Sequence, residues 1–78
     1  MFQLTITKIN EVLFEGQAES LTVPATDGEM TVLHAHMPLI TTLKEGNAVV
    51  RVKGEPERRI PIGGGILEVN RDGATVIL

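Results

Sequence analysis

The sequence predicts an all-β protein: a small β-sandwich or flattened barrel of about eight to ten short, mostly antiparallel strands. Val, Ile and Thr, which favour strands, together make up 23 of the 78 residues. Apolar and polar residues alternate over short segments, and no segment shows the spacing of an amphipathic helix. The 8 Gly and 4 Pro fall mainly between these segments, where turns are expected.

In the first part of the chain we expect five strands, each an apolar segment bounded by turn residues: residues 2–9, 12–14, 18–23, 30–33 and 39–43. The first alternates with period two, which places Phe2, Leu4 and Ile6 on one side. The second is expected to stop at Gly16. The third is expected to end at Pro24, because proline cannot donate a hydrogen bond to a neighbouring strand.

Four more strands are expected in the second part of the chain: residues 48–53, 58–62, 66–69 and 74–78. The first of these directs Ala48, Val50 and Val52 inward. Pro61 places the next strand at an edge of the sheet. The triplet at residues 63–65, Gly-Gly-Gly, precedes a strand rather than a helix, so it predicts a bulge or close backbone crossing and not a phosphate-binding loop.

Length and composition exclude several classes of function. A chain of 78 residues and 8.4 kDa is expected to form one domain over residues 1–78. A net charge of −3, with two Phe and no Trp, leaves neither a basic patch nor a stacking platform, so no nucleic-acid partner is expected. The absence of Cys excludes disulfides and thiolate zinc sites. The longest uncharged stretch, residues 30–43, is too short to span a bilayer.

No pattern in the sequence indicates catalysis. His34 and His36 could share a metal, with Asp27 or Glu29 nearby, but the pair lacks a fixed third ligand. Two loop histidines on a polar rim are the simpler interpretation, and a metal-dependent enzyme stays a remote alternative. Ser20 lies within an expected strand, which argues against a serine nucleophile. We therefore expect no catalytic residue, no cofactor and no metal.

The segment at residues 27–38 is the best candidate for a contact surface. It is expected to bring Glu29, His34, His36 and Met37 together near one end of the sandwich. A loop with exposed Met and His side chains is a reasonable place for a partner to bind. An ordinary loop is the alternative interpretation.

Two ordered motifs carry a resemblance to a known family: DGEMTVLHAHMPLITTLKEG at residues 27–46 and GGGILEV at residues 63–69. With them, essentially the whole chain resembles the N-terminal β-sandwich of the epsilon subunit of F-type rotary ATP synthases. Six residues of the first motif are in register with the family pattern: Gly28, Glu29, His36, Pro38, Thr41 and Gly46. Thr31 stands where the family usually has Gly, and His34 where it usually has Pro.

The resemblance implies a part of a rotor rather than a catalyst. Its partners would be the gamma subunit and the ring of c subunits, and the chain would couple ion-driven rotation of the ring to gamma during ATP synthesis. Glu29 and His36 match family positions that face the c-ring. The positions that match regions near gamma are Thr41, Gly63, Gly64, Gly65 and Ile66.

The resemblance also implies a location. The chain would be peripheral, on the cytoplasmic face of the inner or plasma membrane or its organellar equivalent, and would reach the membrane only through the c-ring. The family's C-terminal helical hairpin is missing, so no inhibition through such a hairpin is expected. The alternative is a free-standing β-sandwich binding or regulatory module that has lost the rotor role. The missing hairpin and the departures at Thr31 and His34 motivate it.

Overall fold

The computed structural model describes residues 1–35 and 37–78, and in these ranges it is all-β, as predicted. Its strands are β1 (Phe2–Lys8), β2 (Glu11–Ala18), β3 (Ser20–Ala25), β4 (Gly28–Val32), β5 (Leu39–Leu43), β6 (Gly46–Arg51), β7 (Arg58–Ile62), β8 (Gly65–Asn70) and β9 (Gly73–Ile77). Most predicted boundaries agree with these strands to within two residues.

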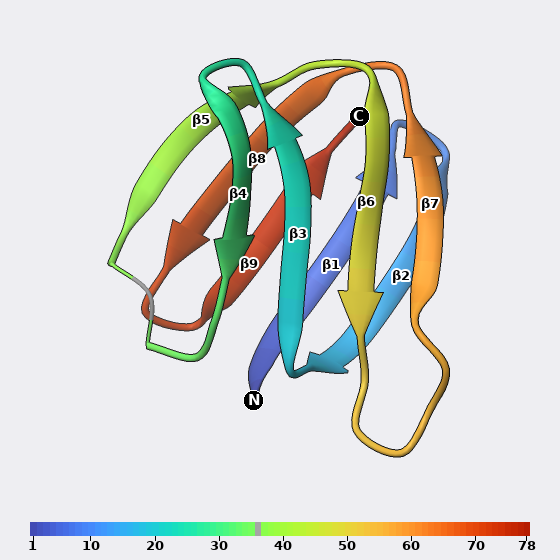
Figure 1. The fold of residues 1–78 in the computed structure, drawn as a ribbon, viewed down its shortest axis with the longest axis vertical. Helices are drawn as coiled ribbons and strands as arrows, with labels where there is room; N and C mark the ends of the chain where they lie inside the picture. The colour runs from blue at the N-terminus through green and yellow to red at the C-terminus, as the bar shows by residue number, and fades with distance from the viewer. Residues whose placement is uncertain (36) are drawn as a thin grey trace.

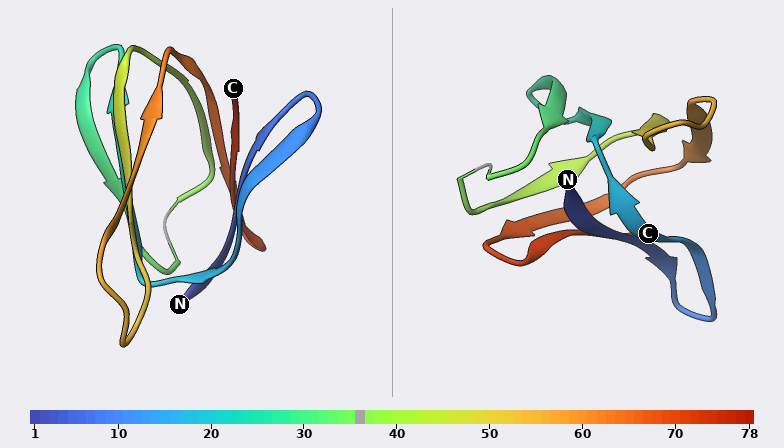
Figure 2. Two further views of the ribbon diagram at one scale, coloured as in Figure 1. Left: turned by 90° about the vertical axis from the view of Figure 1, so that its right-hand side faces the viewer. Right: turned by 90° about the horizontal axis from the view of Figure 1, so that it is seen from below.

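The strands form one sheet that curls on itself into two layers. Their order is β2-β1-β9-β8-β5-β3-β6-β7. The remaining strand, β4, lies outside this order and pairs with β3. Figure 1 shows β3, β4, β6 and β7 in front of β1, β2, β8 and β9, and Figure 2 shows the separation of the layers from the side. The predicted sandwich of mostly antiparallel strands is confirmed. The exception to the antiparallel pattern is β1, which pairs in parallel with β9.

An aliphatic core fills the space between the layers. The six side chains predicted to face inward on β1 and around β6 all belong to it or pack against it: Phe2, Leu4, Ile6, Ala48, Val50 and Val52. Val50 has no exposed surface. Because a slip of one residue would turn this strand's buried side chains toward water, the burial of Val50 specifies the register of β6.

The predicted ends of two strands are wrong. β2 continues through Gly16, which pairs with Leu4, because β1 offers a partner along the whole strand. β3 continues through Pro24, whose carbonyl accepts a hydrogen bond of 2.8 Å from the Lys44 amide. The N and C=O of a strand residue point to the same edge, so the missing N–H of Pro24 faces away from β4. The pairing of Pro24 with Glu29 of β4 is therefore kept.

The close backbone crossing predicted near the Gly triplet is confirmed at Gly65. A Cβ on Gly65 would lie 2.5 Å from the carbonyl oxygen of Ile77, whereas one on Gly63 would meet nothing within 4 Å. Gly73, at the start of β9, lies in the same way against the backbone of Gln3. Glycine at these two positions lets β9 fit between β8 and β1.

The two ends of the curled sheet are β2 and β7, so the predicted edge position of the strand that contains Pro61 is confirmed. These strands do not pair with each other in the sheet. The guanidinium of Arg58 on β7 lies 5.4 Å from the centre of the Phe14 ring on β2. A cation above an aromatic face is favourable, so this contact links the two edge strands β2 and β7.

Candidate partner interfaces

The outward side of β4 carries a line of exposed side chains that ends in the connector to β5. Glu29, Thr31 and Leu33 face solvent, while Val32 between the last two is buried in the core. This alternation follows from the pleat of the strand. The Thr31 hydroxyl lies 3.0 Å from the Thr22 hydroxyl of β3, which links the line to the neighbouring strand. We call Glu29, Thr31 and Leu33 the β4 stripe.

The expected gathering of Glu29 with His34 and Met37 at one end of the sandwich is wrong. Glu29 lies near the start of β4, whereas His34 and Met37 follow its end, and Figure 1 shows these ends at opposite sides of the front layer. β4 is extended from Glu29 to Val32, and three steps at roughly 3.3 Å per residue already separate Glu29 from the end of the strand by about 10 Å. His36, the second residue of the predicted ring contact, lies outside the described residues.

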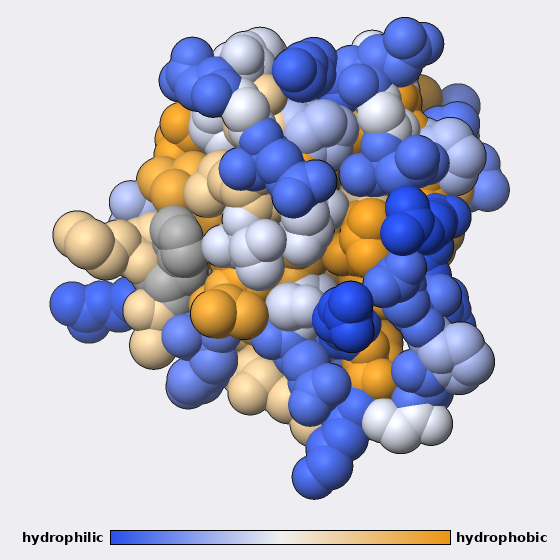
Figure 3. Space-filling view, in the orientation of Figure 1, coloured by the Kyte–Doolittle hydropathy of each residue, from blue (hydrophilic) through white to orange (hydrophobic). Residues whose placement is uncertain are grey.

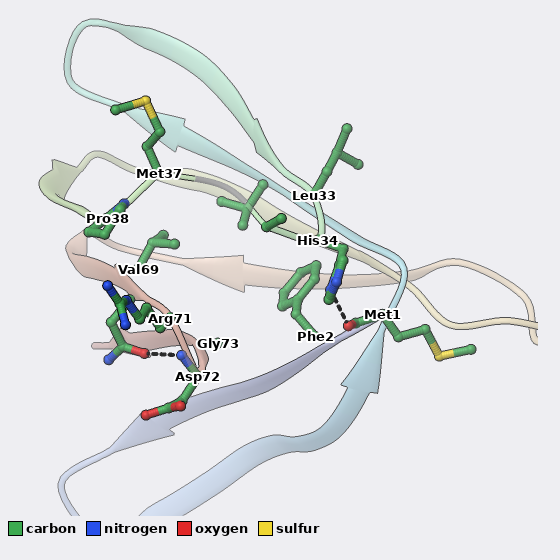
Figure 4. Close-up of a pocket in the computed structure, with 13 residues that line it drawn as sticks. Met1, Phe2, Leu33, His34, Met37, Pro38, Val69, Arg71, Asp72 and Gly73 are labelled. Carbon is green, nitrogen blue, oxygen red and sulfur yellow. Dashed lines mark hydrogen bonds between the residues drawn. The ribbon is translucent and has the colours of Figure 1, made fainter.

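A cleft lies where the connector, the β8–β9 turn and the start of β1 meet. Its volume is about 540 Å³. Phe2 and Val69, both nearly buried, line its inner part. Leu33 and Met37 line it as well but are 56% and 78% exposed, and Figure 4 shows both on the connector. Large apolar side chains that stay exposed beside a cleft are typical of contact surfaces.

Polar groups around the cleft shape its loops. The Nδ1 atom of His34 lies 2.6 Å from the carbonyl oxygen of Met1, and Figure 4 shows this contact. The Asp72 amide donates a hydrogen bond of 2.8 Å to Oδ1 of Asn70, which stabilises the β8–β9 turn. Ala35, next to His34, has a φ of 64°, a value found in no other non-glycine residue that the structure describes. These contacts fix the position of His34 and the conformation of the β8–β9 turn.

The geometry offers little to a metal ion. Within residues 1–35 and 37–78, no group of three or more His, Asp or Glu side chains is arranged to hold one. The Nδ1 atom of His34 is already engaged with the Met1 carbonyl. In the same ranges, the structure contains no helix whose length and hydropathy would let it cross a membrane.

The residues predicted to lie near gamma are on β5, on β8 and in the bend before β8, and their side chains face two ways. Ile66 is 46% exposed, whereas its neighbour on β8, Leu67, is buried in the core. Thr41 pairs with Leu67 and is half-buried, so it lies on the inner side. Gly63, Gly64 and Gly65 form the bend before and at the start of β8. The structure thus turns Ile66 outward and Thr41 inward, and of the three glycines only Gly63 is exposed.

The outer surface around Ile66 is larger than the sequence suggested. Thr42, Ile66, Ile77, Thr7 and Val12 follow one another in register across five strands. Ile66, Ile77, Val12 and Ile40 of this surface are all exposed by 46% or more, and we call these four residues the outer apolar face. The signal that was missed is a large aliphatic residue at an outward position of four of these five strands, all except β1.

The side of the molecule formed by β3, β4, β6 and β7 carries both hydrophilic and hydrophobic side chains (Figure 3). Figure 3 looks onto the layer of β3, β4, β6 and β7, where hydrophilic and hydrophobic areas alternate. Glu57 there forms ion pairs of 3.2 Å with Arg51 and 3.0 Å with Arg59. Both arginines are largely exposed, so each pair contributes little to stability.

Comparisons with known proteins agree on one family. Residues 1–78 match the family model described as ATP synthase, Delta/Epsilon chain, beta-sandwich domain. The chain is 34% identical over 76 residues to an ATP synthase epsilon chain from Herminiimonas arsenicoxydans, covering 96% of this chain and 54% of the relative. It is 37% identical over 78 residues to ATP synthase epsilon chain 2 from Burkholderia orbicola, covering 96% and 50%. The chain therefore spans about half the length of these relatives.

A solved structure shows the same fold. A chain in the cryo-EM structure of the Euglena gracilis mitochondrial ATP synthase, which includes F1 and the c-ring, matches with a TM-score of 0.90 and 26% sequence identity. The match covers 97% of this chain and 49% of that one. The shared sandwich thus extends over nearly all of the present chain.

Proposed function

The chain belongs to the β-sandwich family of ATP synthase delta/epsilon chains, and from this premise we propose that it is a non-catalytic subunit of an F-type ATP synthase. In this proposal it lies in the central stalk and couples rotation of the c-ring to the gamma subunit. The observation that carries the proposal is the family match over residues 1–78. The similarity to a chain in a structure that contains F1 and the c-ring supports it.

The architecture suits a mechanical role. Two layers enclose an aliphatic core in which the largest fully buried side chains come from both layers: Leu4, Ile6, Leu21, Val23, Val32, Val50, Leu67 and Val76. Dense packing of this kind has low compressibility and transmits force between opposite surfaces. A subunit held between two moving partners needs this property more than it needs a catalytic cleft.

We assign the contact with the c-ring to the β4 stripe and the connector that follows it. Glu29 presents an exposed carboxylate that can pair with basic side chains of a partner. His36 belongs to the same proposal through its place in the family pattern. An exposed ion pair contributes only about 0–1 kcal/mol, so shape and buried area must supply most of the affinity. Leu33 and Met37 add apolar area beside the stripe.

We assign the contact with gamma to the outer apolar face and the Gly63–Gly65 bend. Ile66 lies in this surface and pairs with Ile77, so two exposed isoleucines stand side by side. Apolar side chains at the centre of an interface usually carry most of its binding energy. Thr41, which faces inward, would support this surface from beneath and not touch the partner.

In this proposal the chain is peripheral, on the side of the membrane that carries F1, which is the cytoplasmic side in a bacterium. It would meet the bilayer only through the c-ring. Two surfaces on different sides of the sandwich allow both partners to bind at once. The alternative, a free-standing binding module with the same fold, predicts binding to neither partner.

A titration of the chain against gamma, with and without the c-ring, tests the proposal. Saturable one-to-one binding that the ring strengthens is the expected result. Glu29→Arg should weaken the contribution of the ring and leave binding to isolated gamma unchanged. Glu55→Arg, a charge reversal in the exposed β6–β7 loop, is the matched control and should change neither. No binding at tens of micromolar would overturn the proposal in favour of the free-standing module.

A further inference from the structure

His34 connects the two layers beside the cleft, which it lines together with Met1. It lies directly after Leu33 in the connector between β4 and β5, while Met1 leads into β1 of the other layer. The Nδ1 atom of His34 and the carbonyl oxygen of Met1 are 2.6 Å apart although the residues are 33 positions apart in sequence. This contact therefore joins segments that no strand pairing joins.

The direction of this hydrogen bond determines the state of the imidazole. A carbonyl oxygen carries no hydrogen and can only accept. The Nδ1 atom must therefore donate, so the neutral His34 ring carries its proton on Nδ1 and leaves Nε2 as an acceptor. Phe2, which follows Met1, is 7% exposed and anchored in the core. The Met1 carbonyl, which accepts the hydrogen bond, is therefore held in place by the buried residue that follows it.

The connector has a conformation that needs such support. Ala35, the residue after His34, has a φ of 64°, which is unfavourable for a residue with a Cβ. Conformations of this kind persist where the surrounding contacts hold them. On the other side of His34, Leu33 is 56% exposed and has little packing of its own. The hydrogen bond to Met1 ties this stretch to the start of β1 in the other layer.

We propose that His34 is a positioning residue, whose Nδ1–H bond to the Met1 carbonyl holds residues 33–35 of the connector in the conformation that binds the c-ring. The proposal rests on the function proposed above and identifies a residue that acts at the same surface without pairing with the partner itself. Without the bond the connector samples other conformations. The apparent affinity then falls in proportion to the fraction that remains competent to bind.

The first test is the protonation state of the ring. The 15N chemical shifts of His34 in the isolated chain, recorded at alkaline pH where imidazole is neutral, report which nitrogen carries the proton. We expect the Nδ1–H tautomer. The Nε2–H tautomer, which is the usual one for a histidine free in water, would overturn the proposal. This measurement requires neither gamma nor the ring.

The second test compares three substitutions in the ring-dependent titration. Asn places its side-chain N–H one bond beyond Cγ, as Nδ1 of His does, whereas Gln places it one bond farther out. We expect His34→Ala and His34→Gln to weaken binding to the gamma and c-ring complex about three- to tenfold, and His34→Asn to stay within about twofold of the unchanged chain. His34 is exposed, so all three should melt like the unchanged chain.

The two proposals fail in different ways. If Glu29→Arg weakens ring-dependent binding but His34→Ala does not, the positioning role is wrong and the rotor role stands. Equal effects of His34→Asn and His34→Gln would also overturn the positioning role. If the unchanged chain binds no ring, the rotor role fails and the positioning role, which rests on it, fails with it. The tautomer then shows whether the bond to Met1 itself exists.

Discussion

The strand β6 and the connector at residues 33–38 are built in opposite ways. β6 pairs with β3 on one side and with β7 on the other, and its Ala48 and Val50 have no exposed surface. In the described part of the connector, Leu33 and Met37 are largely exposed and Ala35 has a positive φ. Many weak contacts determine the conformation of β6. The conformation of the connector at residues 33–35 depends on a few specific contacts, among them the hydrogen bond of His34 to Met1.

This difference separates residues that maintain the fold from residues available to a partner. A buried strand tolerates few substitutions, because each of its side chains is surrounded by others. An exposed connector can accept changes without loss of the fold, and its exposed side chains are accessible to another molecule. Substitutions of the same kind should therefore have effects of very different size in the two regions.

The largest contrast is expected from introducing a carboxylate into each region. Val50→Asp places a charge where the side chain has no exposed surface, and we expect at least about 4 kcal/mol of destabilisation, enough to unfold a domain of this size. Leu33→Asp, at a side chain that is 56% exposed, should change stability by less than about 0.5 kcal/mol. Thermal melting followed by circular dichroism measures both. A folded Val50→Asp protein would contradict the register of β6.

A smaller contrast is expected within the Gly triplet. In Gly65→Ala the new Cβ would lie 2.5 Å from the Ile77 carbonyl oxygen, at a φ of +145°. We expect a loss of about 1–3 kcal/mol in the free energy of unfolding. Gly63→Ala meets nothing within 4 Å and should be neutral within about 0.5 kcal/mol. Urea titrations of the two variants measure the difference, and equal midpoints would show that no close crossing exists at Gly65.

The outer apolar face should affect binding rather than stability. Ile66→Ser removes apolar area from the centre of the surface proposed for gamma, and we expect about 1–2 kcal/mol of lost binding energy. Its melting temperature should stay close to that of the unchanged chain, because the Ile66 side chain lies on the outer side of β8. Leu33→Ser, at a side chain that is 56% exposed and lies outside this surface, is the control for binding to isolated gamma. Unchanged gamma binding by Ile66→Ser would exclude this face.

The smallest effect is expected on ring-dependent binding, from changing the charge at Glu29 in the β4 stripe and at His36. Glu29→Arg combined with His36→Glu should weaken ring-dependent binding by about three- to tenfold, because exposed ion pairs are weak and screened by salt. The effect should shrink as the salt concentration of the binding assay rises. The variant should remain folded, since Glu29 is exposed. An unfolded variant would mean that the segment is structural and that the interface has been assigned to the wrong residues.

Much of the fold could be predicted from the sequence. The all-β class, the inward side chains of β1 and β6 and the edge position of β7 follow from period two and from Pro61. These features are local, because the pleat alone decides which neighbours share a face. The family could also be predicted, because the motif around Glu29 and the Gly triplet lies in the linear sequence.

Less of the candidate site could be predicted, because it depends on which strands become neighbours. The parallel pairing of β1 with β9 joins the two ends of the chain. Strand alternation gives no information on such a partner, since every strand with one apolar face fits the same core. The separation of Glu29 from His34 also depends on strand pairing. The backbone of β4 is extended between them because β4 pairs with β3.

By itself, the sequence thus determined the class of fold, the family and the side of each strand that is buried, since these follow from the order of apolar, polar and turn residues. Only the tertiary structure decided that Thr41 and Ile66 face opposite ways, that four strands share the outer apolar face and that His34 reaches the carbonyl of Met1. The reason is physical. Local pattern is set within a few residues, whereas these contacts arise from the packing of the whole sheet around one core.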